Sequence, residues 1–224
     1  MAKITICTVA AYGTTPAFVT LTDKRKAEYC FRHDIDYQRS SVNAHPEEAP
    51  NWSKFQAVRE ALKAGAEWAV WMDADAAPMN DRKDLDELLG GMPQRMVIQR
   101  NSEGWDGAVF AMPNTEMAFK MLDALDATYT LRRFRHARHT DHTAIAYYAD
   151  TDFQDFIQEP PSDFGWCQTL NIYARGLELN EYQHHRSWCL HVPNKKDRLR
   201  EAIFNEFMEK TTHAERQRNH QIDI

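Results

Sequence analysis

Apolar residues recur along the chain in two alternating patterns, short β-branched or aromatic runs and longer stretches with helical spacing. Apolar runs of about 4–8 residues bounded by polar, glycine or proline positions are typical of buried strands. Apolar residues three and four positions apart are typical of helices that cover one face of a sheet. The alternation of the two patterns predicts one α/β domain.

Four predicted strands have apolar, β-branched or aromatic runs and lie at Ile4–Val9, Trp68–Met72, Met96–Gln99 and Gly107–Met112. A weak alternation predicts a further strand at Ile35–Val42. The predicted helices share an apolar face and lie at Pro16–Arg32, from Asn51 or Ser53 to Gly65, Asp81–Leu89, Glu116–Leu125, Thr140–Tyr148 and Asp197–Lys210. The first helix is expected to turn Phe18, Leu21, Ala27 and Phe31 to the core. Expected side-chain caps are Asn51 or Ser53, Asp81, and Thr140 or Asp141. Residues 1–210 are expected to form a single domain, followed by a loose polar tail over 211–224.

The apolar run Trp68–Met72 ends at two carboxylates, Asp73 and Asp75, separated by one residue. Two like charges at the end of a buried strand indicate that a cation binds there. Carboxylate oxygens suit Mg²⁺ or Mn²⁺ that also holds a phosphate, and ligands of open α/β sheets bind just beyond the carboxyl ends of strands. An isolated Asp-x-Asp is more often a solvated turn, but the preceding apolar strand favours a metal site.

Two further positions are candidate nucleotide contacts. Tyr12 lies in the loop Ala10–Pro16 after the first strand, where it is placed to stack on a base. An ordinary connection between strand and helix explains this loop equally well. Lys54 lies in the first turn of a helix, where the helix dipole disfavours a cation. This position indicates that Lys54 interacts with an anion.

Composition and charge narrow the class of partner. The net charge of -6 over 224 residues gives no overall basic field for nucleic acid or an acidic membrane surface. One basic segment, Leu131–His139, could serve phosphate or nucleic acid, although a solvated surface or a pairing with acidic residues 150–155 is favoured. The four cysteines show no C-x-x-C spacing, and no window reaches about 18 uninterrupted apolar residues. A cytoplasmic protein with reduced thiols and no transmembrane segment is expected.

Several of these features occur in the order of a known family. They are Trp52–Lys54, the segment Glu67–Asp75, the glycine-containing strand Gly107–Met112, Asp141–Ala144 and His191–Lys196. Together they resemble glycosyltransferase family 34, which contains galactosyl-, xylosyl- and mannosyltransferases. The resemblance extends over residues 3–196, and its most specific feature is W-x-x-W-M-D-x-D. It implies a GT-A fold, a Rossmann-like α/β domain with a mixed central sheet flanked by helices.

The resemblance also implies roles for particular residues. The metal ligands would be Asp73, Asp75 and His191, and an imidazole ligand favours Mn²⁺, with Mg²⁺ possible. The donor contacts would be Lys54, Asp73, Gly107, Lys195 and Lys196, with Tyr12 added from its loop position. The residues expected at the donor sugar and the reacting face are Asp106, Asp141 and His142. The chain carries Asp106-Gly107 where family members commonly carry Asn-x-Gly, and His142 where a glutamine is usual.

The implied function is a metal-dependent retaining transfer of a sugar from a nucleotide sugar, a UDP-sugar by preference, to an acceptor hydroxyl. The acceptor hydroxyl would attack on the face from which the phosphate leaves. The leaving phosphate would take the acceptor proton, so no separate base is required. Asp141 would stabilise the transition state or position sugar hydroxyls. A glycan, a lipid-linked sugar and a nucleic acid remain open as acceptors. Two alternatives stand beside this prediction. One is a soluble viral or microbial transferase that glycosylates a modified DNA base through Arg132–His139, and the other is a catalytically idle module that binds nucleotide and metal.

Overall fold

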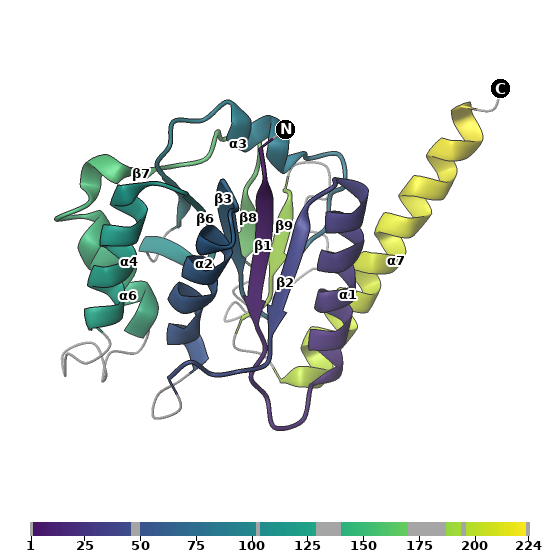
Figure 1. Cartoon of the computed structure of the whole chain (residues 1–224). Helices are drawn as coiled ribbons and strands as arrows, with labels where there is room; N and C mark the ends of the chain where they lie inside the picture. The colour runs from purple at the N-terminus through teal and green to yellow at the C-terminus, as the bar shows by residue number, and fades with distance from the viewer. Residues whose placement is uncertain are drawn as a thin grey trace.

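The computed structural model describes residues 2–45, 50–101, 104–128, 140–169, 187–193 and 196–222, the last thirteen of these and residue 140 by their backbone alone. A six-stranded sheet runs through its centre in the order β2-β1-β3-β6-β5-β7 (Figure 1). Its strands are β1 (Ile4–Val9), β2 (Asp36–Ser40), β3 (Trp68–Met72), β5 (Met96–Asn101), β6 (Gly104–Pro113) and β7 (Ile157–Gln158).

The sheet is mixed, because β1 pairs in parallel with β2 and β3 whereas β6 is antiparallel to both β3 and β5. All five predicted strands are confirmed, two with the predicted bounds and three with ends that shift by up to three residues. A second sheet of three strands has the order β4-β9-β8 and consists of β4 (Ala76–Pro78), β8 (Cys167–Thr169) and β9 (Cys189–His191). The short strands β4, β7, β8 and β9 were not predicted individually, since strands of two or three residues leave too little periodic signal.

Helices cover both faces of the central sheet (Figure 1). On one side, α2 (Ser53–Lys63) contacts β1 and β3 as well as α4 (Glu116–Thr128), and α6 (Thr140–Ala149) contacts β6. On the other side, α1 (Ala17–Arg32) packs against α7 (Asp197–Ile222). The remaining helices are α3 (Leu85–Gly90) and the single-turn 3₁₀ segments η1 (Pro50–Trp52) and η2 (Gln154–Phe156). None of the helices in the described part of the chain is long and apolar enough to cross a membrane.

Two helix predictions require correction, the end of the last helix and the buried face of the first. The helix α7 continues to Ile222, so the expected end near Lys210 and the loose tail after it are wrong. The segment between these residues contains no glycine or proline that would end a helix. On α1, Phe31 is 89% exposed and Ala27 is also exposed, while Arg25 and Lys26 are buried instead. These cations are buried because they find partners that the sequence alone does not reveal.

The caps predicted for α2 and α3 are also wrong. Trp52 precedes α2 and gives no side-chain cap, and the Ser53 hydroxyl donates to Asn43 Oδ1 at 2.8 Å. Helix α3 is capped by Asp84, whose carboxylate accepts from the Asp86 amide, because Asp81 is engaged by Arg25 and Arg32. Asp141 lies inside α6 and pairs with a lysine described below.

Candidate metal and nucleotide site

The turn that carries Asp73 and Asp75 joins β3 of the central sheet to β4 of the small sheet. Four successive backbone carbonyls in this turn each accept a hydrogen bond from another element. The bonds run from Thr8 Oγ1 to Met72 (2.7 Å), from Lys26 Nζ to Asp73 (2.9 Å), from Thr22 Oγ1 to Ala74 (2.6 Å) and from the Val192 amide to Asp75 (3.0 Å). The turn is thereby fixed to β1, to α1 and to the residue after β9.

The structure brings the three predicted metal ligands together. Asp73, Asp75 and His191 each offer one ligand atom, and these atoms all lie within 4.8 Å of one another. His191 reaches this place because β9 pairs with β4 in a register that sets His191 opposite Ala76. The Asp73 and Asp75 side chains keep 23% and 17% exposure, so the group is reachable from solvent. Two carboxylates with one imidazole form a donor set that suits a divalent cation.

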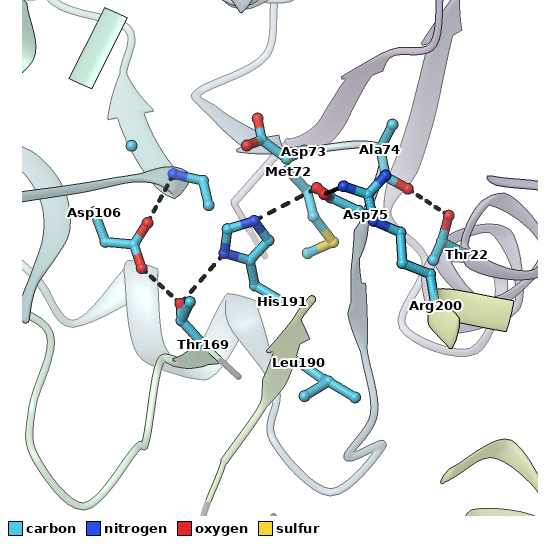
Figure 2. A network of polar contacts seen from close by, with 12 residues as sticks. Thr22, Met72, Asp73, Ala74, Asp75, Asp106, Thr169, Leu190, His191 and Arg200 are labelled. Atoms are coloured by element: carbon cyan, nitrogen blue, oxygen red, sulfur yellow. Dashed lines mark hydrogen bonds and ion pairs between the residues drawn. The ribbon is translucent and has the colours of Figure 1, made fainter. Parts of the chain in front are cut away.

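Asp75 has two basic neighbours, one on each carboxylate oxygen (Figure 2). His191 Nε2 lies 3.4 Å from Oδ1, and Arg200 Nη2 of α7 lies 3.2 Å from Oδ2. Burial would raise the pKa of Asp75, but His191 and Arg200 together lower it below its usual value. Sequence reasoning missed Arg200, since nothing in the pattern of α7 separates it from the other cations of this helix.

The imidazole of His191 is buried and linked to Asp106 through Thr169 (Figure 2). Thr169 Oγ1 lies 3.3 Å from His191 Nδ1 and donates to Asp106 Oδ2 at 2.8 Å. Burial would lower the pKa of His191, but Asp75 and Asp106 raise it to about 9. No local pattern pointed to Thr169, which lies in a strand of three residues.

Asp106 was expected at the donor sugar, and the structure places it 5% exposed beside the metal group. Its Oδ1 accepts from the Ala108 amide at 3.1 Å, and its Oδ2 also accepts from Asn101 Nδ2 at 3.3 Å. Burial would raise the pKa of this carboxyl, but His191 and the Thr169 hydrogen bond lower it. Its described partners are thus protein groups.

Lys54 interacts with anions as predicted, and these anions are carboxylates of the protein itself. The side chain is 1% exposed, and its Nζ lies 2.5 Å from Asp141 Oδ2 and 3.4 Å from Asp73 Oδ1. It also donates to the Gly107 carbonyl at 3.0 Å. Burial would lower the pKa of Lys54, but Asp141 and Asp73 raise it above its usual value. The expected contact of Lys54 with a donor stays a prediction.

The start of α6 packs closely on β6 at Gly107. A Cβ at this position would lie 2.9 Å from Ile145 Cδ1 and 3.2 Å from His142 Cδ2, so the glycine permits the approach. The approach brings Asp141, which is 1% exposed, onto Lys54 and sets His142 Nε2 3.7 Å from Asp141 Oδ2. Burial lowers the pKa of His142 although Asp141 opposes the effect, so its imidazole is neutral at pH 7.

The remaining predicted donor contacts lie at the edge of this group or beyond the described chain. Tyr12 follows β1, is 43% exposed, and meets the Phe18 ring edge-on at a centroid distance of 6.3 Å. Lys196 is exposed just before α7. Lys195 and the basic segment Arg132–His139 lie outside the described residues.

A cavity of about 470 Å³ lies between the end of β5, the segment after β7 and the strand β8. Two of its lining residues, Asn101 and Thr169, both donate to Asp106 Oδ2, so the cavity borders the polar network around His191. The described lining residues are Gln99, Asn101, Glu159, Pro160, Pro161, Ser162, Gly165, Trp166, Cys167, Gln168, Thr169 and Ser187.

Comparison with known proteins bears on the first part of the chain. Residues 4–92 match the galactosyl transferase GMA12/MNN10 family, a range that includes Lys54, Asp73 and Asp75. The resemblance to this glycosyltransferase family is confirmed. A probable glycosyltransferase 6 of Oryza sativa subsp. japonica is 29% identical over 111 residues, which cover 45% of this chain and 23% of that protein. Xyloglucan 6-xylosyltransferase 1 of Arabidopsis thaliana is 27% identical over 111 residues, 45% of this chain and 24% of that protein.

The match thus spans about a quarter of the length of these curated relatives. Solved structures extend the likeness to most of the fold. A glycosyltransferase involved in the glycosylation of the major capsid of PBCV-1 superimposes with a TM-score of 0.71 at 15% identity, over 91% of this chain and 99% of that one. The glycosyltransferase GlyE of Streptococcus pneumoniae TIGR4 gives a TM-score of 0.54 at 10% identity, over 94% and 64%. The predicted GT-A fold is confirmed, and the predicted enzyme class agrees with all of these proteins, which are glycosyltransferases by name.

Proposed function

We propose that the protein is a metal-dependent, retaining glycosyltransferase that moves a sugar from a UDP-sugar to an acceptor hydroxyl. The observation that carries the proposal is the convergence of Asp73, Asp75 and His191 within 4.8 Å at the carboxyl end of β3. This is where ligands bind in open α/β sheets, and the donor set suits a divalent cation. The match of residues 4–92 to a galactosyl transferase family supports the sugar-transfer chemistry.

The protein groups support the donor in distinct ways. Bound Mn²⁺ would offset the charge that develops on the departing nucleoside diphosphate. The backbone bonds to the Asp73–Asp75 turn hold its carboxylates in place before a donor arrives. Tyr12 is half-exposed at the same strand end, where its ring is placed to cover a uracil base. Lys196 is an exposed cation in the loop after β9, within the part of the chain expected near the diphosphate.

The environment of Asp141 favours a mechanism without a protein base. Its carboxylate is 1% exposed and held at 2.5 Å by Lys54, so it is poorly placed to take a proton from an acceptor. The ion pair also holds Asp73, because Lys54 contacts both carboxylates. We therefore assign Asp141 to positioning, and the acceptor proton to the leaving phosphate. The new glycosidic bond then forms on the face from which the phosphate departs, which retains the anomeric configuration.

We place the acceptor in the cavity beside Asn101 and Thr169. Its described lining offers amides, hydroxyls and the carboxylate of Glu159, and none of these described residues is a cation. Hydroxyl-rich sugars bind well to amides and carboxylates, whereas a phosphodiester requires Lys or Arg contacts. The cavity therefore favours an uncharged glycan over a nucleic acid. The DNA-base alternative depends on Arg132–His139, which lies outside the described residues.

Donor hydrolysis tests the proposal. The purified protein should release UDP from at least one common UDP-sugar when Mn²⁺ is present, and chelation should abolish the release. Asp75→Asn should abolish it as well, whereas Asp36→Asn on the exposed edge strand β2 should not. No UDP release from any common UDP-sugar, together with unchanged nucleotide affinity in Asp73→Ala, would refute the transferase. Nucleotide binding without any hydrolysis or transfer would favour the idle binding module.

A further inference from the structure

A chain of hydrogen bonds runs from Asp106 through Thr169 to His191 (Figure 2). The small sheet creates it, since β8 and β9 pair in parallel with Thr169 directly beside His191. The same strand β9 pairs with β4, which places His191 next to the Asp73–Asp75 turn. The chain of bonds therefore ends on the one imidazole of the candidate metal group.

The direction of these hydrogen bonds follows from the donor and acceptor inventory. Both oxygens of Asp106 accept, Oδ1 from the Ala108 amide and Oδ2 from Asn101 and Thr169, as expected of an ionised carboxylate. The Thr169 hydroxyl has a single hydrogen, and this hydrogen points to Asp106. Its oxygen can then only accept at His191, so Nδ1 carries a hydrogen.

A hydrogen on Nδ1 leaves Nε2 as the nitrogen that can bind a cation. Nε2 is also the nitrogen that faces Asp75, at 3.4 Å from Oδ1. We infer that Thr169 and Asp106 are positioning residues that fix the tautomer and the ring orientation of His191 for a divalent cation. The inference rests on the metal site of the proposed function. Hydrogen-bond partners of this kind typically change metal affinity by about 10- to 100-fold when they are removed.

This inference changes the role expected for Asp106. A residue that touches the donor sugar needs accessible oxygens, but Asp106 is 5% exposed and its oxygens accept three hydrogen bonds from protein groups. Asp106 therefore acts through Thr169 and His191. The Asn101 and Thr169 side chains that donate to Asp106 also line the cavity. A ligand in the cavity would therefore contact the same hydrogen-bond network.

Metal affinity in the absence of any donor tests the inference. Titration of the full chain with Mn²⁺, followed by water-proton relaxation, should give about 10- to 100-fold weaker binding for Thr169→Val, which keeps the shape and loses the hydroxyl. Thr169→Ser should restore most of the affinity. Thr128→Val is the matched control, because it removes a buried threonine hydroxyl that bonds to Ala124 and Tyr148, away from the site. It should bind Mn²⁺ as the natural protein does.

The protonated nitrogen gives a second readout that does not depend on affinity. With Zn²⁺ as a diamagnetic probe, ¹⁵N spectra should show the His191 signals with hydrogen on Nδ1 and metal on Nε2, and His191→Gln identifies these signals by their loss. Equal Mn²⁺ affinity of Thr169→Val and the natural protein would overturn the inference and leave the metal site standing, as would metal on Nδ1. Absence of Mn²⁺ binding by the natural protein would overturn both.

Discussion

Lys54 shows how a single buried cation holds several functional groups in one arrangement. Its ammonium group contacts the carboxylates of Asp141 and Asp73 and the carbonyl of Gly107. These residues come from β3, β6 and α6 or from the turns beside them, so Lys54 links α2 to three other parts of the fold. Removal of one partner of a buried ion pair strongly destabilises the fold, because the other charge stays buried without an opposite charge.

Lys54→Met should lower the free energy of unfolding by about 3–5 kcal/mol, since Asp141 would then be a buried charge without its partner. Urea unfolding at pH 7 measures the change. Adding Asp141→Asn should recover part of the loss, because the uncompensated charge is removed. A double variant that is no more stable than Lys54→Met would contradict this explanation.

His191 should couple metal binding to pH. Its pKa of about 9 reflects burial that is outweighed by Asp75 and Asp106, so the imidazole holds an extra proton at pH 7 without a cation. The cation must displace that proton, and binding should release about one proton per Mn²⁺. Apparent affinity should therefore rise between pH 7 and 9, by up to about tenfold per pH unit, and level off above. Calorimetry in buffers of different ionisation enthalpy measures the released protons, and no release at pH 7 would show that His191 is neutral or is not a ligand.

At the scale of elements, the contact between β6 and α6 sets the geometry around Asp141. Gly107 permits this contact, because a side chain there would meet Ile145 and His142. Both residues belong to the first turns of α6, and Ile145 is fully buried in the core. A larger residue at position 107 would therefore act on the whole helix.

Gly107→Ala should destabilise the fold by about 1–3 kcal/mol, the usual cost of overpacking a dense core. The added Cβ would lie 2.9 Å from Ile145 Cδ1, so Ile145→Val, which removes this methyl, should recover stability in the double variant. Thermal and urea unfolding measure both effects. If Ile145→Val destabilises the two backgrounds equally, the contact does not cause the loss.

The elements also show how far sequence reasoning reaches. Four of the central strands were predicted because each buries a continuous apolar run, β2 because its residues alternate weakly, and the Asp73–Asp75 turn because carboxylates end such a run. The small sheet was not predicted as a unit, since its three-residue strands are defined by pairing with distant segments. Thr169 and Arg200 contact the site through that sheet and through α7, so their roles depend on tertiary placement that local pattern does not encode.

At the scale of the molecule, the site combines residues that lie far apart in the sequence. The region that matches the family, residues 4–92, supplies Asp73 and Asp75, whereas His191 and Arg200 come from beyond it. The matched region therefore contains only two of the three candidate metal ligands. A donor that contacts the cation and both parts should stabilise the whole fold by linkage.

UDP with Mn²⁺ should raise the unfolding temperature more than UDP alone. At about 100 times its dissociation constant, the nucleotide should add roughly 2.7 kcal/mol of stability. A thermal-shift panel of UDP, GDP and CDP with and without Mn²⁺ gives the preferred base, and Asp75→Asn should remove the Mn²⁺-dependent part. A larger shift with GDP than with UDP would contradict the proposed donor.

The insertion of β9 between β4 and β8 has a consequence for how the site is made during synthesis. The ribosome delivers Asp73 and Asp75 more than a hundred residues before His191, and a domain generally folds as a unit. Until β9 has emerged and paired, the nascent chain presents the two aspartates without their imidazole partner. The complete donor set therefore forms late, and a divalent cation should add little stability to a nascent chain that ends before β9.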